Sequence, residues 1–165
     1  MDPVLSGHQS WRRVRVVRTG AAPAAGVDPT ITVPGGKFWT VRNAFVSLLT
    51  SGIAGTRTPM LQVTVDGTII ARIIPNTTVG ASGGLTLFWA QDVNQQTGNG
   101  STNVTRIPEF QLPAGSVVGL STSGIDAGDQ YGALGLYVTE QDDQGGPTDT
   151  AELLRAMADR IEGGA

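Results

Sequence analysis

The chain has 165 residues, 39% of them hydrophobic, so it is long enough for one domain with a proper core and too short for two ordinary ones. It contains no cysteine, which excludes a disulfide framework and a thiolate metal site. The net charge is only −3, but residues 1–72 carry eight Lys/Arg against three Asp/Glu and residues 126–165 carry two against nine. This polarity suits docking on a charged surface or head-to-tail subunit contacts, unless the charges are simply solvated on unrelated loops.

The N-terminal segment has no apolar run of the length that a signal peptide needs, and no segment approaches 18 consecutive apolar residues. We therefore expect a soluble protein, made in the cytoplasm, with no membrane partner.

The first predicted strand is 11–18, with Trp11, Val14 and Val16 as candidates for its buried side. Four arginines fall in seven residues here. Because the guanidinium fork suits phosphate and carboxylate groups, three of them are candidate partner-binding residues: Arg12, Arg13 and Arg15. The alternative is a paired edge strand with charged outer positions. The acidic pI of the whole chain speaks against direct nucleic-acid binding.

Residues 20–29 form a small-residue linker, and residues 30–33 a short strand. A long strand follows over 37–49, where apolar residues recur at or near every second position. Two further strands, 59–66 and 68–73, flank Asp66-Gly67, a dipeptide that supplies the positive φ values of a two-residue hairpin turn.

Further strands are predicted over 85–90, 104–107, 116–121 and 131–140. The polar segment 91–103 is an exposed loop that either recognises a partner or is only solvated. About 8–9 short strands with no helix between them predict antiparallel pairing, hence an all-β sandwich or jelly roll rather than a parallel α/β fold.

The pattern changes after residue 140. Residues 141–148 read as a flexible linker, and 149–162 as a short amphipathic α-helix that begins with a capping box, Asp149 and Glu152. Its apolar stripe needs a partner surface, which is its own sandwich, copies of the helix or another protein. The stripe consists of Leu153, Leu154, Met157 and Ile161. The predicted organisation is thus an N-terminal arm and first strand (1–19), a sandwich (20–140), a linker and a helix.

Residues for catalysis are scarce. His8 is the one histidine, which is too few for a cupin-type metal site and leaves a Ser-His-Asp triad dependent on the N-terminal tail. Asp126 and Asp129, with Asp142 and Asp143, could hold Ca²⁺, although Asp-Gly turns are far commoner than calcium loops. We expect no enzyme activity, no cofactor and no metal.

Three runs carry a family resemblance: GGKFWTVRNAFVSLLTS, TRTPMLQVTVDGTII and IPEFQLPAGSVVGLSTSGIDAGDQYGALGLYVTE. Together they make residues 34–140 resemble jelly-roll virion proteins of tailed bacteriophages. The resemblance implies a capsid decoration (cementing) protein, bound as a homotrimer to the major capsid protein on the exterior of the virion. The alternative that it leaves open is a receptor- or glycan-binding head of a tail or head fibre, with a host surface glycan as partner.

Overall fold

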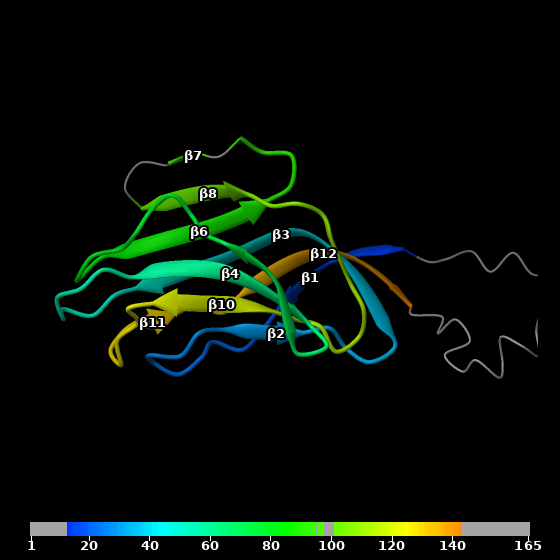
Figure 1. The fold of residues 1–165 in the computed structure, drawn as a ribbon, viewed down its shortest axis with the longest axis horizontal. Helices are drawn as coiled ribbons and strands as arrows, with labels where there is room; N and C mark the ends of the chain where they lie inside the picture. The colour runs from blue at the N-terminus through cyan, green and yellow to red at the C-terminus, as the bar shows by residue number, and fades with distance from the viewer. Residues whose placement is uncertain (1–12, 95, 98–100, 143–165) are drawn as a thin grey trace, which may run out of the picture.

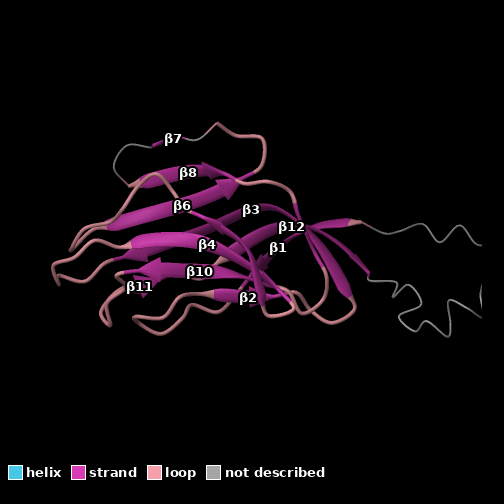
Figure 2. Ribbon diagram, in the orientation of Figure 1, coloured by secondary structure: helices cyan, strands magenta, loops and turns pink. Residues whose placement is uncertain are grey.

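A computed structural model describes residues 13–94, 96–97 and 101–142. Within them the chain forms two packed β-sheets, and every regular element is a strand (Figures 1 and 2). The predicted all-β sandwich is therefore confirmed. No helix in this part of the chain is long and apolar enough to cross a membrane. Several predicted features lie outside the described residues: Trp11, Arg12, and the helix 149–162 with Leu153, Leu154, Met157 and Ile161.

The larger sheet, sheet A, has eight strands in the order β1-β12-β3-β6-β8-β7, with β9 and β11 also paired to β3. Its strands are β1 (Val14–Thr19), β3 (Lys37–Leu49), β6 (Gly84–Ala90), β7 (Gln96–Thr97), β8 (Thr102–Arg106), β9 (Phe110–Leu112), β11 (Gln130–Tyr131) and β12 (Gly135–Asp142).

The smaller sheet, sheet B, has four strands in the order β2-β10-β4-β5. Its strands are β2 (Thr30–Thr32), β4 (Thr58–Val65), β5 (Thr68–Ile73) and β10 (Val117–Ser123). The predicted Asp66-Gly67 turn joins β4 to β5, and both residues have positive φ, 48° and 75°. That geometry matches the right-handed twist of a hairpin.

The core lies between the two sheets and is built by the alternating positions of their strands. Trp39 and Trp89 are its largest apolar side chains and are at most 1% exposed. Leu61 and Val63 of β4 and Val118 of β10 face them from sheet B and are equally buried. Burying side chains of this size is the main stabilising contribution to such a fold.

Strand β3 has the bounds that the sequence predicts, but its alternation slips once. Val41 pairs with Val138 and Asn43 with Tyr137, so Arg42 has no opposite residue in β12. This bulge moves the buried positions from odd numbers, such as Trp39, to even numbers beginning with Ala44. A bulge of this kind re-aims side chains, and here it leaves Arg42 and Asn43 both on the outer side of the sheet.

One pairing differs from the prediction of a wholly antiparallel fold. Strands β6 and β8 are parallel. The reason is the short strand β7, which lies within the predicted polar loop 91–103: the chain turns back through β7, and β8 then pairs antiparallel with β7 and inserts between it and β6. A hairpin thus supplies the reversal for which parallel strands usually need a helix.

The prediction for 131–140 was wrong in one detail, because two strands replace the one that was expected. Gly132 donates a backbone hydrogen bond to the Ser47 carbonyl (2.9 Å), and the chain then leaves the ladder until Gly135. Val14 was also expected on the buried side of β1, but it is 41% exposed, whereas Val16 packs against the core. Val14 is the first residue of β1, at the end of the strand, whereas Val16 lies in its middle.

Both limits of the described chain lie at one end of the sandwich, called here the terminal end. Val14 at the start of β1 pairs with Glu140, and Asp142 at the end of β12 pairs with Lys37 (Figure 1). The opposite end, called the loop end, carries the connections 50–57, 74–83 and 124–129.

Candidate functional site

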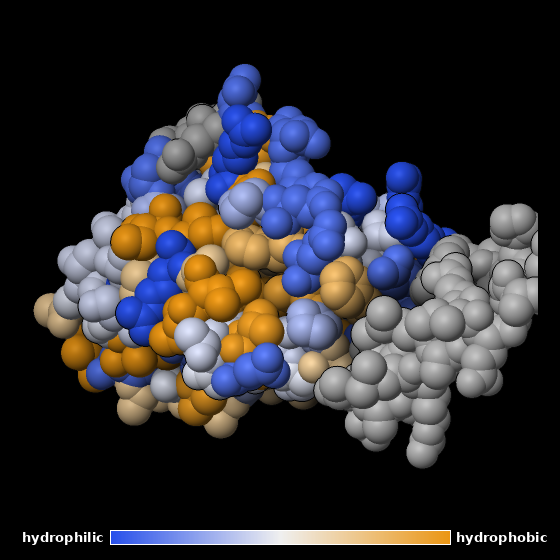
Figure 3. All heavy atoms as spheres, turned by 45° about the vertical axis from the view of Figure 1, so that its right-hand side comes forward, coloured by the Kyte–Doolittle hydropathy of each residue, from blue (hydrophilic) through white to orange (hydrophobic). Residues whose placement is uncertain are grey.

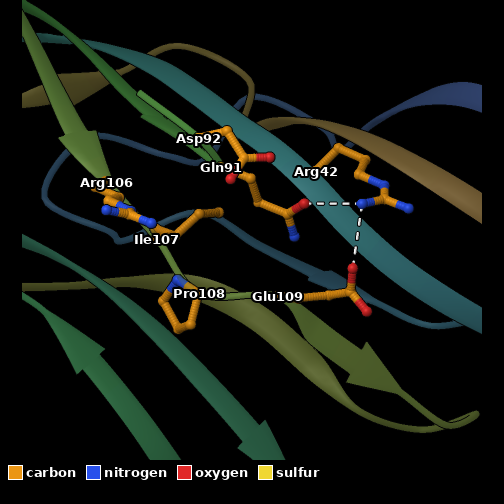
Figure 4. A pocket seen from close by; sticks show the side chains of 7 residues that line it. All are labelled: Arg42, Gln91, Asp92, Arg106, Ile107, Pro108 and Glu109. Atoms are coloured by element: carbon orange, nitrogen blue, oxygen red, sulfur yellow. Dashed lines mark hydrogen bonds and ion pairs between the residues drawn. The ribbon is translucent and has the colours of Figure 1, made fainter. Parts of the chain in front are cut away.

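A groove of about 490 Å³ lies on the described surface. It forms where the middle of β3 meets the residues after β6 and the segment that connects β8 to β9 (Figure 4). Most of the residues that line it are polar or charged: Arg42, Gln91, Asp92, Arg106, Ile107, Pro108 and Glu109. The groove is therefore suited to a hydrophilic ligand rather than to an apolar one.

Local structure positions each wall of this groove. The bulge in β3 turns Arg42 outward, and the backbone N–H of Gln91 bonds to the Arg42 carbonyl (3.2 Å), which fixes the chain just after β6. Asp92 follows in a turn with a φ of 53°, a conformation that aspartate tolerates better than most residues. On the other wall, Pro108 lies just after the last residue of β8, Arg106.

Hydrogen bonds hold the polar side chains of the groove in place. Gln91 Nε2 donates to the Val41 carbonyl (2.8 Å), which orients the amide. Arg42 Nη1 donates to Gln91 Oε1 (2.9 Å) and to Glu109 Oε2 (3.1 Å; Figure 4). Gln111 Nε2 donates to the other carboxylate oxygen of Glu109 (3.0 Å). Arg42 thus keeps Nε and Nη2 without a protein partner among the described residues.

A second hollow, of about 320 Å³, continues the groove across sheet A. It shares Arg42, Gln91 and Asp92 with the first and adds Arg15, Asn43 and Tyr137. The predicted partner-binding residue Arg15 thus lies at this surface, whereas Arg13 is exposed just before β1. Three guanidinium groups, those of Arg15, Arg42 and Arg106, border the combined groove.

An aromatic pair lies beside the groove on the outer face of sheet A. Phe45 and Phe88 stack with their ring centroids 6.3 Å apart and an interplanar angle of 29°, yet they remain 36% and 39% exposed. Phe45 covers Gly135, where a Cβ atom would collide with the ring. Since Asn43 is two residues from Phe45 on the same face, the pair begins about 7 Å from the groove.

Arg18, the fourth arginine of the basic cluster, has a structural role at the terminal end. Its Nη2 and Nε atoms both bond to Glu140 Oε2 (2.6 and 3.0 Å), which also accepts a bond from Trp39 Nε1 (2.9 Å). Lys37 Nζ lies 3.5 Å from the other carboxylate oxygen. Burial raises the pKa of Glu140, but the bonds from Arg18 and Trp39 outweigh it, and the pKa lies below its ordinary value.

A second acidic residue is buried at the loop end. Asp129 is 0% exposed and Arg57 is 1% exposed. The two form a bidentate ion pair, with Nε–Oδ2 at 2.8 Å and Nη2–Oδ1 at 3.1 Å. The backbone N–H groups of Ser51 and Asp126 donate to the same carboxylate, each at 2.8 Å. Burial acts to raise the pKa of Asp129, but these donors hold it far below its ordinary range.

This network bears on the calcium interpretation of the acidic turn. Both oxygens of Asp129 are already occupied by protein donors, so the carboxylate joins loop 50–57 to loop 124–129 instead of facing an open site. Within residues 13–94, 96–97 and 101–142, no group of three or more His, Cys, Asp or Glu side chains is arranged to hold a metal ion.

Sequence reasoning missed most of the groove, because its walls come from three segments far apart in the chain. Of the residues that line the first hollow, Gln91 and Asp92 lie in the loop 91–103, which was considered for recognition. Arg15, which lines the second hollow, was a candidate partner-binding residue. One signal was available: Val41 and Ala44 are both apolar but three residues apart, which indicates an irregularity at Arg42.

Comparisons with known proteins identify no family. No protein-family model matches the chain, and no curated protein matches it. Among solved structures, PfGH50B is 7% identical with a TM-score of 0.33, and a nora virus structure is 14% identical with a TM-score of 0.30. Each alignment covers 84% of this chain, but only 24% of the PfGH50B chain and 59% of the nora virus chain. The chain thus spans less than two thirds of either structure that it matches.

Proposed function

We propose that the protein is a structural component of a bacteriophage particle, namely a capsid decoration protein that binds the major capsid protein as a homotrimer on the outside of the virion. The proposal combines the family resemblance of residues 34–140 with the surface of sheet B. It includes no catalytic activity, no cofactor and no direct contact with nucleic acid.

The observation that carries the proposal is the apolar edge of sheet B. Strand β5 pairs with β4 alone among the described strands, so one row of its backbone N–H and C=O groups is open. Ile69 and Ile70 in this strand are 45% and 53% exposed, and Ile74 just after it is 59% exposed. Hydrophobic residues gather on this side of the molecule (Figure 3). Edge strands of soluble monomers are usually protected by charge or cover, so an apolar edge is typical of an assembly surface.

The terminal end supports attachment to a shell. Because β1 begins beside the last residues of β12, the chain both enters and leaves the sandwich at the same end. Segments that extend from there could anchor the domain while the loop end points outward. The predicted helix 149–162 follows from this end, and its apolar stripe is our candidate for the contact with a second subunit or with the capsid.

Light scattering coupled to size-exclusion chromatography tests the oligomer. We expect three times the chain mass of 17.1 kDa. Ile70→Lys should give a folded monomer, because the side chain is exposed at a bulge of the edge strand. Val17→Lys is the matched control, since Val17 is 58% exposed on an edge strand of the other sheet. A wild-type monomer, or a trimer that survives Ile70→Lys, contradicts the proposed interface.

The second candidate function is a receptor- or glycan-binding head of a phage fibre. The polar groove around Arg42 and Gln91 favours it, because a decoration role alone does not require a braced set of hydrogen-bonding side chains. Adsorption of the purified chain to host cells tests it, and a chain that does not adsorb contradicts this candidate.

A further inference from the structure

The groove on sheet A has a composition that defines a class of ligand. Guanidinium donors (Arg42 and Arg106), an amide (Gln91) and carboxylate acceptors (Asp92 and Glu109) face one hollow. A sugar ring presents hydroxyl groups that both donate and accept hydrogen bonds, so it needs both kinds of partner. The side chains of an acidic peptide offer only acceptors, so they leave Asp92 and Glu109 without a donor, whereas a uronic acid offers both a carboxylate and hydroxyl donors.

We propose that this groove binds an acidic oligosaccharide, with a sugar carboxylate held between Arg42 and Arg106. The inference rests on the second candidate function and assigns its site and ligand class. Figure 4 shows the two arginines on opposite sides of Gln91. Planar guanidinium groups match the carboxylate geometry and bind it through paired hydrogen bonds.

The Arg42 side chain is prepared for such a ligand. Its Nη1 atom is held by Gln91 and Glu109, so the orientation of the guanidinium is fixed before binding, and Nε and Nη2 remain for a ligand. Among the described residues, neither Arg106 nor Arg15 forms an ion pair. A braced donor loses little conformational freedom on binding, and this favours affinity.

The aromatic pair extends the site beyond one sugar unit. Phe45 and Phe88 expose their rings about 7 Å from Asn43, which borders the second hollow. The apolar face of a sugar ring packs against an exposed aromatic ring, and Tyr137 lines the surface between. The groove and the aromatic pair together therefore fit a chain of a few sugars rather than a single residue.

Isothermal titration calorimetry on the full chain tests the inference. The probes are a tetrasaccharide of galacturonic acid, its carboxyl-reduced neutral counterpart and a glutamate hexapeptide. We expect the acidic tetrasaccharide to bind and the other two to bind at least about tenfold more weakly. The neutral sugar lacks the charged acceptor for the arginines, and the peptide side chains lack hydroxyl donors for Asp92 and Glu109. Equal binding of the neutral sugar or of the peptide overturns the ligand class, and no binding of the acidic sugar overturns the site.

Variants locate the binding. Arg106→Ala should weaken the acidic tetrasaccharide about tenfold with no loss of thermal stability, because Arg106 forms no ion pair among the described residues. Arg72→Ala is the matched control, an exposed arginine on sheet B whose side chain bonds, within the described part of the chain, to Gln62. Equal affinities of the two variants overturn the proposal. Host-cell adsorption that Arg106→Ala leaves unchanged also overturns this site, while the receptor-binding function would stand.

Discussion

The loop end and the terminal end each place one acidic residue between chain segments, but with different surroundings. At the loop end, Asp129 and Arg57 are both almost completely buried, with side-chain exposures of 0% and 1%. At the terminal end, the Glu140 side chain is 9% exposed, whereas its partners Arg18 and Lys37 are 41% and 35% exposed. Removing Arg57 leaves the buried Asp129 carboxylate without its cation, whereas removing Arg18 leaves Glu140 with the hydrogen bond from Trp39 and with Lys37 nearby. The loop end should therefore be the more sensitive to substitution.

The two ends also differ in the structural role of their ion pairs. The buried pair joins the loops 50–57 and 124–129 to each other, and we therefore expect the loop end to be the more rigid of the two. The terminal end relies on ion pairs that water and salt can screen. Adjustable contacts suit the end from which the chain continues toward its proposed anchoring segments.

The largest effect is expected for Arg57→Met. It leaves the Asp129 carboxylate buried without its ion-pair partner, and we expect the midpoint of thermal unfolding to fall by about 10–20 °C. Arg18→Met is the control and should lower the midpoint by about 5 °C at most, because Arg18 is exposed. Equal losses in the two variants, measured by circular dichroism, contradict the comparison of the two ends.

Lowering the pH should show how much the ion pair of Arg57 and Asp129 contributes to stability. The pKa of Asp129 is lower in the folded protein than in the unfolded chain, so its contribution to stability is present above the ordinary pKa of about 4 and is lost as the pH falls below it. Glu140 shifts in the same direction. Urea unfolding should show that the free energy of unfolding decreases between about pH 7 and pH 3. The decrease should be smaller in Asp129→Asn than in the wild type, because the variant has no carboxyl group to protonate at this position. If the free energy of unfolding depends on pH in the same way in the wild type and in Asp129→Asn, the prediction is wrong.

Two glycines extend the comparison to the backbone. Gly124 at the loop end has a φ of 76°, and a Cβ atom there would collide with the Thr56 carbonyl oxygen. Gly36 at the terminal end has a φ of 70° with no atom within 4 Å of an added Cβ. Gly36→Ala should lower the unfolding midpoint by about 5 °C from backbone strain alone. Gly124→Ala should lower it clearly more, and the reverse order is incompatible with a rigid loop end.

The smallest effect is expected for Glu140→Gln. The amide oxygen can still accept the hydrogen bond from Trp39 Nε1, and only the charge toward Arg18 and Lys37 is lost. We expect the midpoint of thermal unfolding to fall by about 3–5 °C at low salt and by less at high salt, since salt screens exposed ion pairs. A large, salt-independent decrease would mean that Glu140 resembles Asp129.

Much of the fold could be predicted from local pattern. The alternation along β3 and the Asp66-Gly67 turn each depend on neighbours in sequence, and both were predicted within one or two residues. The parallel pairing of β6 with β8 could not, because it depends on the path of β7 around the sheet edge.

The site was less predictable than the fold. Arg42, Gln91 and Arg106 become neighbours only through sheet topology, and no motif links them in the chain. The partner of Asp129 is likewise 72 residues away, so the sequence predicted only an acidic turn where the structure has a buried ion pair. Arg15 could be singled out because it stands in a dense basic cluster, but the same cluster contains Arg18, whose partner is Glu140.

The central claim, that this chain decorates a phage shell, is tested most directly by mixing the full-length protein with undecorated capsids and measuring the bound copies per particle by quantitative gel after sedimentation. The account predicts saturable binding in hundreds of copies, with Ile70→Lys and a chain truncated after Gln144 both binding less than Val17→Lys. A monomer that does not sediment with capsids would contradict it.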